Sequence, residues 1–156
     1  MLSYIAGKLC EVLLPINESV YIGKGNDIAV CTLASIDLLR DIASDKRIMD
    51  RITIAGRLLS ENRGIEKLIE SAIKNDLKFI ILVGEDSKGH NAGQALIALH
   101  RNGIDTNGRI IGAIGKNPFL TIGMDRVDEF RSKVKLIDAI GVTDRESVYS
   151  LICSVC

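Results

Sequence analysis

The sequence is poor in aromatic residues, and this shortage excludes one class of protein. Its 156 residues include three phenylalanines and three tyrosines but no tryptophan. Proteins that bind single-stranded nucleic acids stack bases on aromatic side chains, and this chain has few to offer. The 20 basic and 20 acidic residues cancel, so no strongly basic surface is predicted either. We therefore expect no nucleic acid among the partners.

Long hydrophobic runs are also missing. No apolar stretch approaches the roughly 20 residues that span a bilayer, and residues 1–8 lack the basic region and apolar core of a secretion signal. These absences predict a cytoplasmic protein without direct membrane insertion. The four cysteines include Cys153 and Cys156 in a C-x-x-C spacing, at the end of a predicted helix. A zinc or redox site needs a second pair or a better context, so we interpret both as ordinary cysteines.

The chain does contain 47% hydrophobic residues, and many of them form four short continuous runs. Continuous apolar character, without alternation, is typical of strands that are covered on both faces of a parallel sheet. Helical patterns separate the runs. The alternation predicts one α/β domain over residues 1–156, a doubly wound, mostly parallel, Rossmann-like sheet with helices on both faces. The four predicted strands are residues 28–33, 52–55, 79–83 and 109–114.

The helices are predicted from apolar stripes and from capping residues. An N-terminal helix within residues 1–15 is stopped by Pro15, and Gly103 ends the helix that begins at Ala92. Residues 143–146 form a capping box that opens a C-terminal helix over residues 143–156. The other predicted helices cover residues 36–49, 65–73 and 127–140.

Each predicted strand ends in a turn of small and polar residues. The turns are Thr32–Ser35, Gly56–Gly64, Gly84–Gly93 and Gly112–Pro118. In a parallel sheet all four turns lie along one edge, where open α/β sheets bind their ligands. Glycines let the backbone approach a ligand, and the helix N-termini favour anionic groups. The pattern predicts a binding cleft but leaves its ligand open, because glycines are common in such turns.

His90 is the strongest single candidate. It lies on a glycine-flanked turn between the run 79–83 and the helix that begins at Ala92, whereas His100 lies in the middle of that helix. An imidazole in this place can ligate a metal, carry a proton or bind a ligand. The alternative is that His90 caps the helix or donates to a carbonyl. Similarly, the alternative for residues 60–63 is that they have no role beyond capping a helix, and for Asn117 and Pro118 that they only form a turn.

Several separated segments, taken together, resemble one family over residues 20–145. The chain is similar to the A subunit of tetrahydromethanopterin S-methyltransferase, a corrinoid protein of methanogenic archaea. The segments that carry the resemblance, in chain order, are Thr32–Ser35, Ile54–Gly56, Glu61–Lys67, Gly89–Gln94, Ala98–Gly103 and Arg109–Ala113.

The resemblance implies a cobalamin or a related cobamide as cofactor. Its cobalt, as Co(I), accepts a methyl group from methyl-tetrahydromethanopterin and, as methyl-Co(III), passes it to coenzyme M. In the full complex, membrane subunits couple this step to sodium export. The resemblance further implies that His90 is the lower axial cobalt ligand, a role that suits imidazole. The chain is then a methyl carrier that acts with methyl-donor and methyl-acceptor methyltransferase proteins, with no catalytic residue of its own.

The residues expected to contact the corrinoid lie in the four turns. A metal-bound histidine usually donates its second ring N–H to a partner, and Lys88 stands where methionine synthase has an aspartate for this purpose. Glu85, Asp86 or a backbone carbonyl could serve instead, and the sequence does not choose among them. The predicted cofactor-binding residues are Thr32, Leu33, Ala34, Ser35, Gly56, Arg57, Ser60, Glu61, Asn62, Gly64, Gly84, Gly89, His90, Gly93, Gln94, Gly112, Ala113, Asn117 and Pro118.

Two departures from the family bear on the partners. Members of the membrane complex carry a C-terminal transmembrane helix, whereas this sequence stops at Cys156, so we expect a free-standing soluble relative. Arg57 lies in a turn where the family tends to have other residues. One alternative function is a small enzyme or sensor that binds a nucleotide or another metabolite at the same strand-end cleft. Another is an assembly module that docks partners through its N-terminal helix.

Overall fold

The computed structural model describes residues 20–156, which form an α/β domain around a five-stranded sheet. The strands lie in the order β1-β3-β2-β4-β5. Only β1 runs antiparallel to its neighbour, so the predicted, mostly parallel α/β fold is confirmed. The strands are β1 (Tyr21–Ile22), β2 (Ile28–Cys31), β3 (Ile54–Gly56), β4 (Phe79–Leu82) and β5 (Lys135–Asp138).

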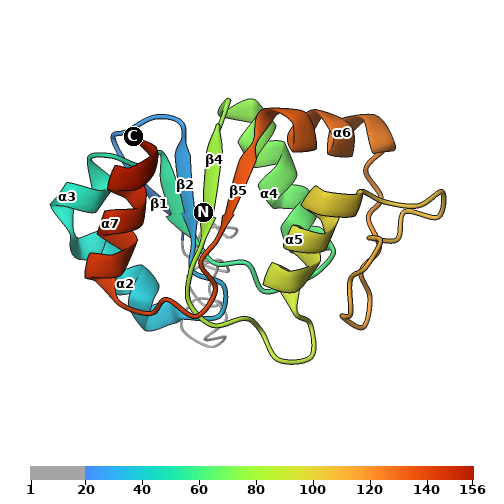
Figure 1. The fold of residues 1–156 in the computed structure, drawn as a ribbon, viewed down its shortest axis with the longest axis horizontal. Helices are drawn as coiled ribbons and strands as arrows, with labels where there is room; N and C mark the ends of the chain where they lie inside the picture. The colour runs from blue at the N-terminus through green and yellow to red at the C-terminus, as the bar shows by residue number, and fades with distance from the viewer. Residues whose placement is uncertain (1–19) are drawn as a thin grey trace, which may run out of the picture.

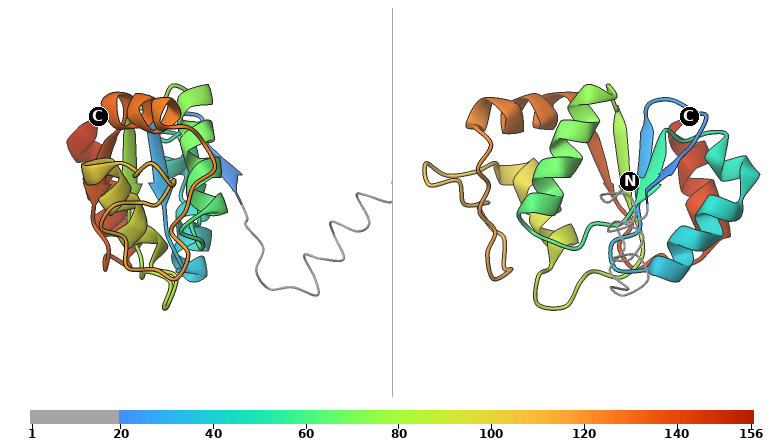
Figure 2. Two further views of the ribbon diagram at one scale, coloured as in Figure 1. Left: turned by 90° about the vertical axis from the view of Figure 1, so that its right-hand side faces the viewer. Right: turned by 180° about the vertical axis from the view of Figure 1, so that it is seen from behind.

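Helices cover both faces of the sheet (Figures 1 and 2). One layer holds α2 (Ile36–Ser44), α3 (Lys46–Met49) and α7 (Arg145–Val155), and the other holds α4 (Arg63–Lys74), α5 (Ala92–Asn102) and α6 (Met124–Lys133). Successive strand residues belong to opposite layers: Val30 packs on the α2 side, and Cys31 packs on the α4 side. This two-sided burial explains the continuous apolar runs in the sequence.

The chain reverses its direction across the sheet at β2. From β2 it continues through α2 and α3 to the neighbouring β3, and then crosses through α4 to β4 on the other side of β2. The loops after β2 and β4 therefore leave the sheet toward opposite faces. Such a switch point is where open α/β sheets place their ligands.

The prediction of a fourth strand over residues 109–114 is wrong. Those residues belong to an irregular excursion between α5 and α6, which forms only the isolated bridges Ile104–Ile110 and Arg109–Phe119. Ile110 is buried, whereas Ile111 is exposed, so the run is covered on one side only.

The fourth parallel strand is β5, which lies inside the predicted helix 127–140. That helix ends at Lys133, because Val134 is extended and the N–H of Lys135 donates to the carbonyl of Lys78. This edge strand has a charged residue at each end, Lys135 and Asp138, so it does not form the continuous apolar run that predicts a buried strand.

Three smaller predictions also need correction or fall outside the structure. The predicted helix 36–49 is broken at Asp45, whose carboxylate accepts the N–H of Arg47 and starts α3. The cap of the last helix is Asp144 rather than Thr143, because the N–H of Ser147 donates to the Asp144 carboxylate. The short edge strand β1 was not predicted. The predicted N-terminal helix lies outside the described residues.

Candidate functional site

The start of α5 is fixed by the loop that follows β4. The carboxylate of Asp86 accepts the N–H groups of Gly93 at 2.8 Å and of Gln94 at 2.9 Å. These are two of the donors that a helix leaves without partners in its first turn. Asn91, with φ of 47°, turns the chain into the helix. The loop therefore places His90 at a defined position just before α5.

His90 lies at the surface, but one of its ring nitrogens is anchored. Its side chain is 59% exposed, and Nδ1 lies 3.0 Å from Oε2 of Glu61, which is 1% exposed. The other nitrogen, Nε2, lies on the far side of the ring from this carboxylate. Donation from Nδ1 to Glu61 selects the tautomer in which Nε2 carries the lone pair, the form that ligates a metal.

Glu61 is held in place by further donors. Its Oε1 atom accepts the backbone N–H of Asn117 at 2.9 Å. Burial by itself would raise the pKa of Glu61, but hydrogen bonds from its own N–H, from Asn117 and from the His90 ring outweigh the burial and lower the pKa. A buried carboxylate that stays ionised is thus placed directly behind an exposed imidazole.

This contact identifies the partner of His90 that the sequence left open. The partner is Glu61, at the start of α4, rather than Glu85 or Asp86. Asp86 instead caps α5, and the backbone N–H of Glu85 donates to Ser35. No spacing rule links Glu61 to His90, because the two residues are 29 positions apart and meet only when α4 and the β4–α5 loop come together.

The predicted turn Gly112–Pro118 reaches the same place, although no strand precedes it. The side-chain amide of Gln94 donates to the carbonyl of Gly112 at 2.9 Å, and its oxygen accepts the N–H of Ile114 at 3.0 Å. The amide of Asn62 donates to the carbonyl of Asn117 at 3.3 Å. The structure therefore brings together Glu61, Asn62, His90, Gln94, Gly112 and Asn117.

A second group of predicted residues lies at the switch point between β2 and β4. The N–H of Ala34 donates to the carbonyl of Glu85 at 2.9 Å, and the Ser35 hydroxyl accepts the N–H of Glu85 at 2.9 Å. Gly84 has φ of 79°, and a Cβ there would lie 2.4 Å from the carbonyl oxygen of Thr32. The two loops are thus joined directly to each other, and Gly84 permits their close approach.

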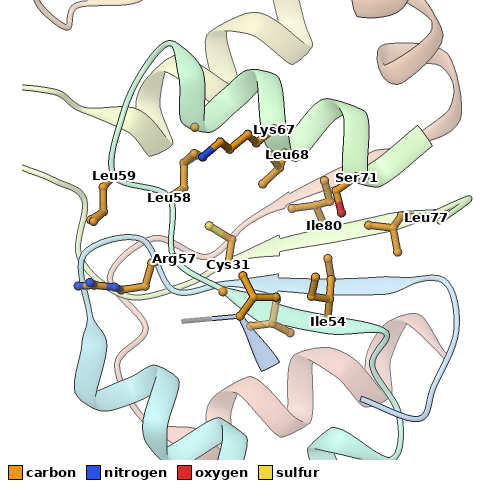
Figure 3. A pocket seen from close by; sticks show the side chains of 15 residues that line it. Cys31, Ile54, Arg57, Leu58, Leu59, Lys67, Leu68, Ser71, Leu77 and Ile80 are labelled. Atoms are coloured by element: carbon orange, nitrogen blue, oxygen red, sulfur yellow. The ribbon is translucent and has the colours of Figure 1, made fainter. Parts of the chain in front are cut away.

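A third group lines a cavity of about 190 Å³ between α4 and the sheet (Figure 3). Gly56, Arg57 and Gly64 contribute to its wall, which is mainly apolar. Cys31 points into it from β2, and burial raises the pKa of this thiol to about 12, so the thiol is protonated at neutral pH.

The remaining predicted residues take structural positions, and their part in ligand binding stays a prediction. Gly93 packs against Leu33, since a Cβ at Gly93 would lie 2.9 Å from that side chain. Ser60 accepts the N–H of Gly64 at 2.7 Å and so helps to cap α4. Gly89, with φ of 83°, adopts the left-handed conformation that its turn requires. Leu33, Ala113 and Pro118 are buried.

Comparison with known proteins now places this arrangement in a family. Residues 15–156 match the family described as the A subunit of tetrahydromethanopterin S-methyltransferase. The chain belongs to this family. The resemblance predicted from the sequence is therefore confirmed, and the Glu61–His90 contact occurs in a member of the A-subunit family.

Relatives come from methanogenic archaea. The A subunit of the putative methyltransferase Mtx of Methanosarcina acetivorans is 36% identical over 141 residues, which cover 88% of this chain and 67% of that protein. Its namesake in Methanosarcina barkeri is 39% identical over 128 residues, covering 80% and 60%. The A subunit of tetrahydromethanopterin S-methyltransferase that is numbered 2 in Methanothermobacter thermautotrophicus is 37% identical over 124 residues, covering 78% and 64%. The chain thus spans about two thirds of the length of these relatives.

Within residues 20–156, no helix combines the length and the apolar character that a membrane span requires.

Proposed function

We propose that the protein is a methyl-carrying subunit that holds a cobamide through His90 and works with separate methyl-donor and methyl-acceptor proteins. The observation that carries the proposal is the His90–Glu61 pair, in a chain of the A-subunit family. A cobamide, when bound, supplies a cobalt that can accept a methyl group and release it. The protein supplies the axial ligand and its orientation.

The donor set fits such a cofactor. Imidazole is a good ligand for first-row transition metals, and His90 offers it from an exposed position with Nδ1 already engaged. Within residues 20–156 there is no cluster of three or more His, Cys, Asp or Glu that could hold a bare ion. A single imidazole suits a metal whose other positions are filled by a macrocycle.

The role of Glu61 follows from its charge and its burial. As a carboxylate behind Nδ1, it would hold the ring in the tautomer and orientation that ligate a metal through Nε2. The carboxylate accepts from Nδ1 at 3.0 Å, so it would hold the imidazole in place whether or not a ligand is bound. The pair can therefore support both a ligating and a non-ligating state of the ring.

A second cavity lies at the switch point between β2 and β4. It gives little support to the alternative function, which is the binding of a phosphorylated or carboxylated metabolite. This cavity of about 460 Å³ is lined by Ser35 and the start of α2, and the acidic residues Asp37, Glu85 and Asp86 outnumber the basic residue Lys88 in its lining. Carboxylates around a site repel an anionic ligand. Stabilisation of the purified protein by a nucleotide but not by cobalamin would nevertheless revive that alternative.

The test is a visible spectrum of the purified protein with hydroxocobalamin, recorded for wild type, His90→Ala and His100→Ala. We expect the wild type and His100→Ala to bind the corrinoid and to shift its absorption bands in the manner of histidine ligation. His90→Ala should lose that shift. Equal binding and equal spectra for all three proteins would contradict the assignment of His90, and a wild type that binds no cobalamin would contradict the function itself.

A further inference from the structure

The surface beside His90 contains an apolar side chain that the protein itself leaves uncovered. Ile114 is 71% exposed, and it belongs to the excursion between α5 and α6. Four of the six large hydrophobic residues that are exposed within residues 20–156 lie between positions 111 and 124. Exposed apolar side chains close to a proposed ligand are candidates for contact with that ligand.

Ile114 is exposed, but hydrogen bonds hold its backbone in place. Its N–H donates to the side chain of Gln94 at 3.0 Å, and the carbonyl of Gly112 accepts from the same side chain. On the other side, the N–H of Asn117 donates to Glu61. Residues 112–117 are thus tied at both ends to the residues that surround His90, and the position of Ile114 is fixed relative to that ring.

Ile114 also lies close to His90. A Cβ on the next residue, Gly115, would come within 2.4 Å of the carbonyl oxygen of His90. Consecutive Cα atoms are about 3.8 Å apart, so the backbone of Ile114 lies one residue from the place where Gly115 passes the backbone of His90. A macrocycle held by His90 that extends toward residues 112–117 would reach Ile114.

The geometry points to Ile114 as an apolar contact for the corrin macrocycle and as a determinant of corrinoid affinity. The inference rests on the proposed function. A corrin has an apolar face and a rim of polar amide groups. Burying an exposed isoleucine against that face removes apolar surface from water, which favours binding. The hydrogen bond to the Gln94 side chain fixes the backbone of Ile114 before the ligand binds, so little backbone ordering is needed on association.

The test compares Ile114→Ser with Ile22→Ser. Ile22, at 75% exposure, is as open as Ile114, but it lies on edge strand β1, across the sheet from α5. We expect Ile114→Ser to weaken hydroxocobalamin binding roughly tenfold, as partial burial of an isoleucine predicts, and Ile114→Leu and Ile22→Ser to bind as the wild type does. The histidine-ligation spectrum of the bound form should persist in Ile114→Ser, because this side chain contacts the face and not the cobalt.

The outcomes separate this inference from the proposed function. A wild type that binds cobalamin, with Ile114→Ser binding equally well, overturns the inference alone and leaves His90 as ligand. An equal loss in Ile22→Ser also overturns it, because the effect would then not be local. A wild type that fails to bind overturns the proposed function and this inference together. Thermal unfolding without ligand should be the same for wild type and Ile114→Ser, which shows that the variant is folded.

Discussion

The two ends of α5 each carry a histidine, and they use it in opposite ways. At the start of the helix, His90 is 59% exposed and binds Glu61 through Nδ1. At the end of the helix, His100 is half-buried, and its Nε2 lies 2.7 Å from the carbonyl oxygen of Val134. Its ring also meets the edge of Phe130.

The difference shows how a histidine can be assigned to structure or to function from its surroundings. His100 joins α5 to the end of α6 and satisfies a backbone carbonyl, which is a structural use of the ring. His90 is paired with a buried carboxylate, and more than half of its side chain is exposed, which suits the ligand-binding role proposed for it. Substitutions at the two ends should therefore affect different measurements.

The largest effect is expected for Glu61→Gln. Glutamine keeps the size of the side chain but removes the charge behind Nδ1, so ligation by His90 should weaken. We expect roughly a tenfold to hundredfold loss of cobalamin affinity, the usual cost of removing a partner of a metal-binding histidine. Spectral titration with hydroxocobalamin measures it. The matched control is Glu85→Gln, an exposed carboxylate on the neighbouring loop, and an equal loss there would argue against a specific role for Glu61.

Next in size is His100→Ala, which should affect stability and not binding. The change removes the hydrogen bond to Val134 and the contact with Phe130. A half-buried carbonyl without its partner, together with lost packing, should lower the free energy of unfolding by about 2 kcal/mol. Urea unfolding checks the stability and cobalamin titration checks the binding. A large loss of affinity in this variant would contradict the conclusion that the histidine at the end of α5 has only a structural role.

A smaller effect is expected for Asp86→Ala at the start of α5. The variant loses the acceptor for the N–H groups of Gly93 and Gln94, and loss of a helix cap costs about 1 kcal/mol. Because the same loop positions His90, cobalamin affinity should fall as well, although less than in Glu61→Gln. Asp86→Asn, which keeps one side-chain oxygen, should recover part of both. If Asp86→Ala proves as stable as the wild type, the loop is not held as described.

The smallest effect is a dependence on pH. The pKa of Glu61 is lowered in the folded protein, so its contribution to stability is fully present above the usual pKa of a glutamate and is lost as the pH falls through the lowered value. The difference in free energy of unfolding between wild type and Glu61→Gln should therefore shrink as the pH falls below about 5. Urea unfolding across this range measures it, and a difference that grows toward acid pH would contradict the assignment.

Patterns within the sequence predicted the part of the fold that depends on local features. The strands around Val30, Ala55 and Ile81 were predicted because residues buried on both faces form continuous apolar runs. The same rule failed for residues 109–114, because these apolar residues belong to an irregular segment that is buried on one side only. It also missed β5, an edge strand with a charged residue at each end.

The site shows the same division between local and distant information. His90 could be predicted because a glycine-flanked histidine at a strand end is visible in the sequence. Its partner Glu61 could not be singled out, because the contact depends on how α4 lies against the loop before α5. The position of Ile114 depends likewise on hydrogen bonds to Gln94 across 20 positions of the chain.

The most direct test of the account asks whether the nitrogen bound to cobalt belongs to His90. Protein labelled with ¹⁵N in its histidines is loaded with cobalamin and reduced to the Co(II) form, and its paramagnetic resonance spectrum is recorded. Ligation by a histidine predicts that each cobalt line is split into a doublet in the labelled wild type and in labelled His100→Ala, in place of the triplet from ordinary nitrogen, and that His90→Ala loses this doublet. A triplet that persists in the labelled wild type would contradict the account.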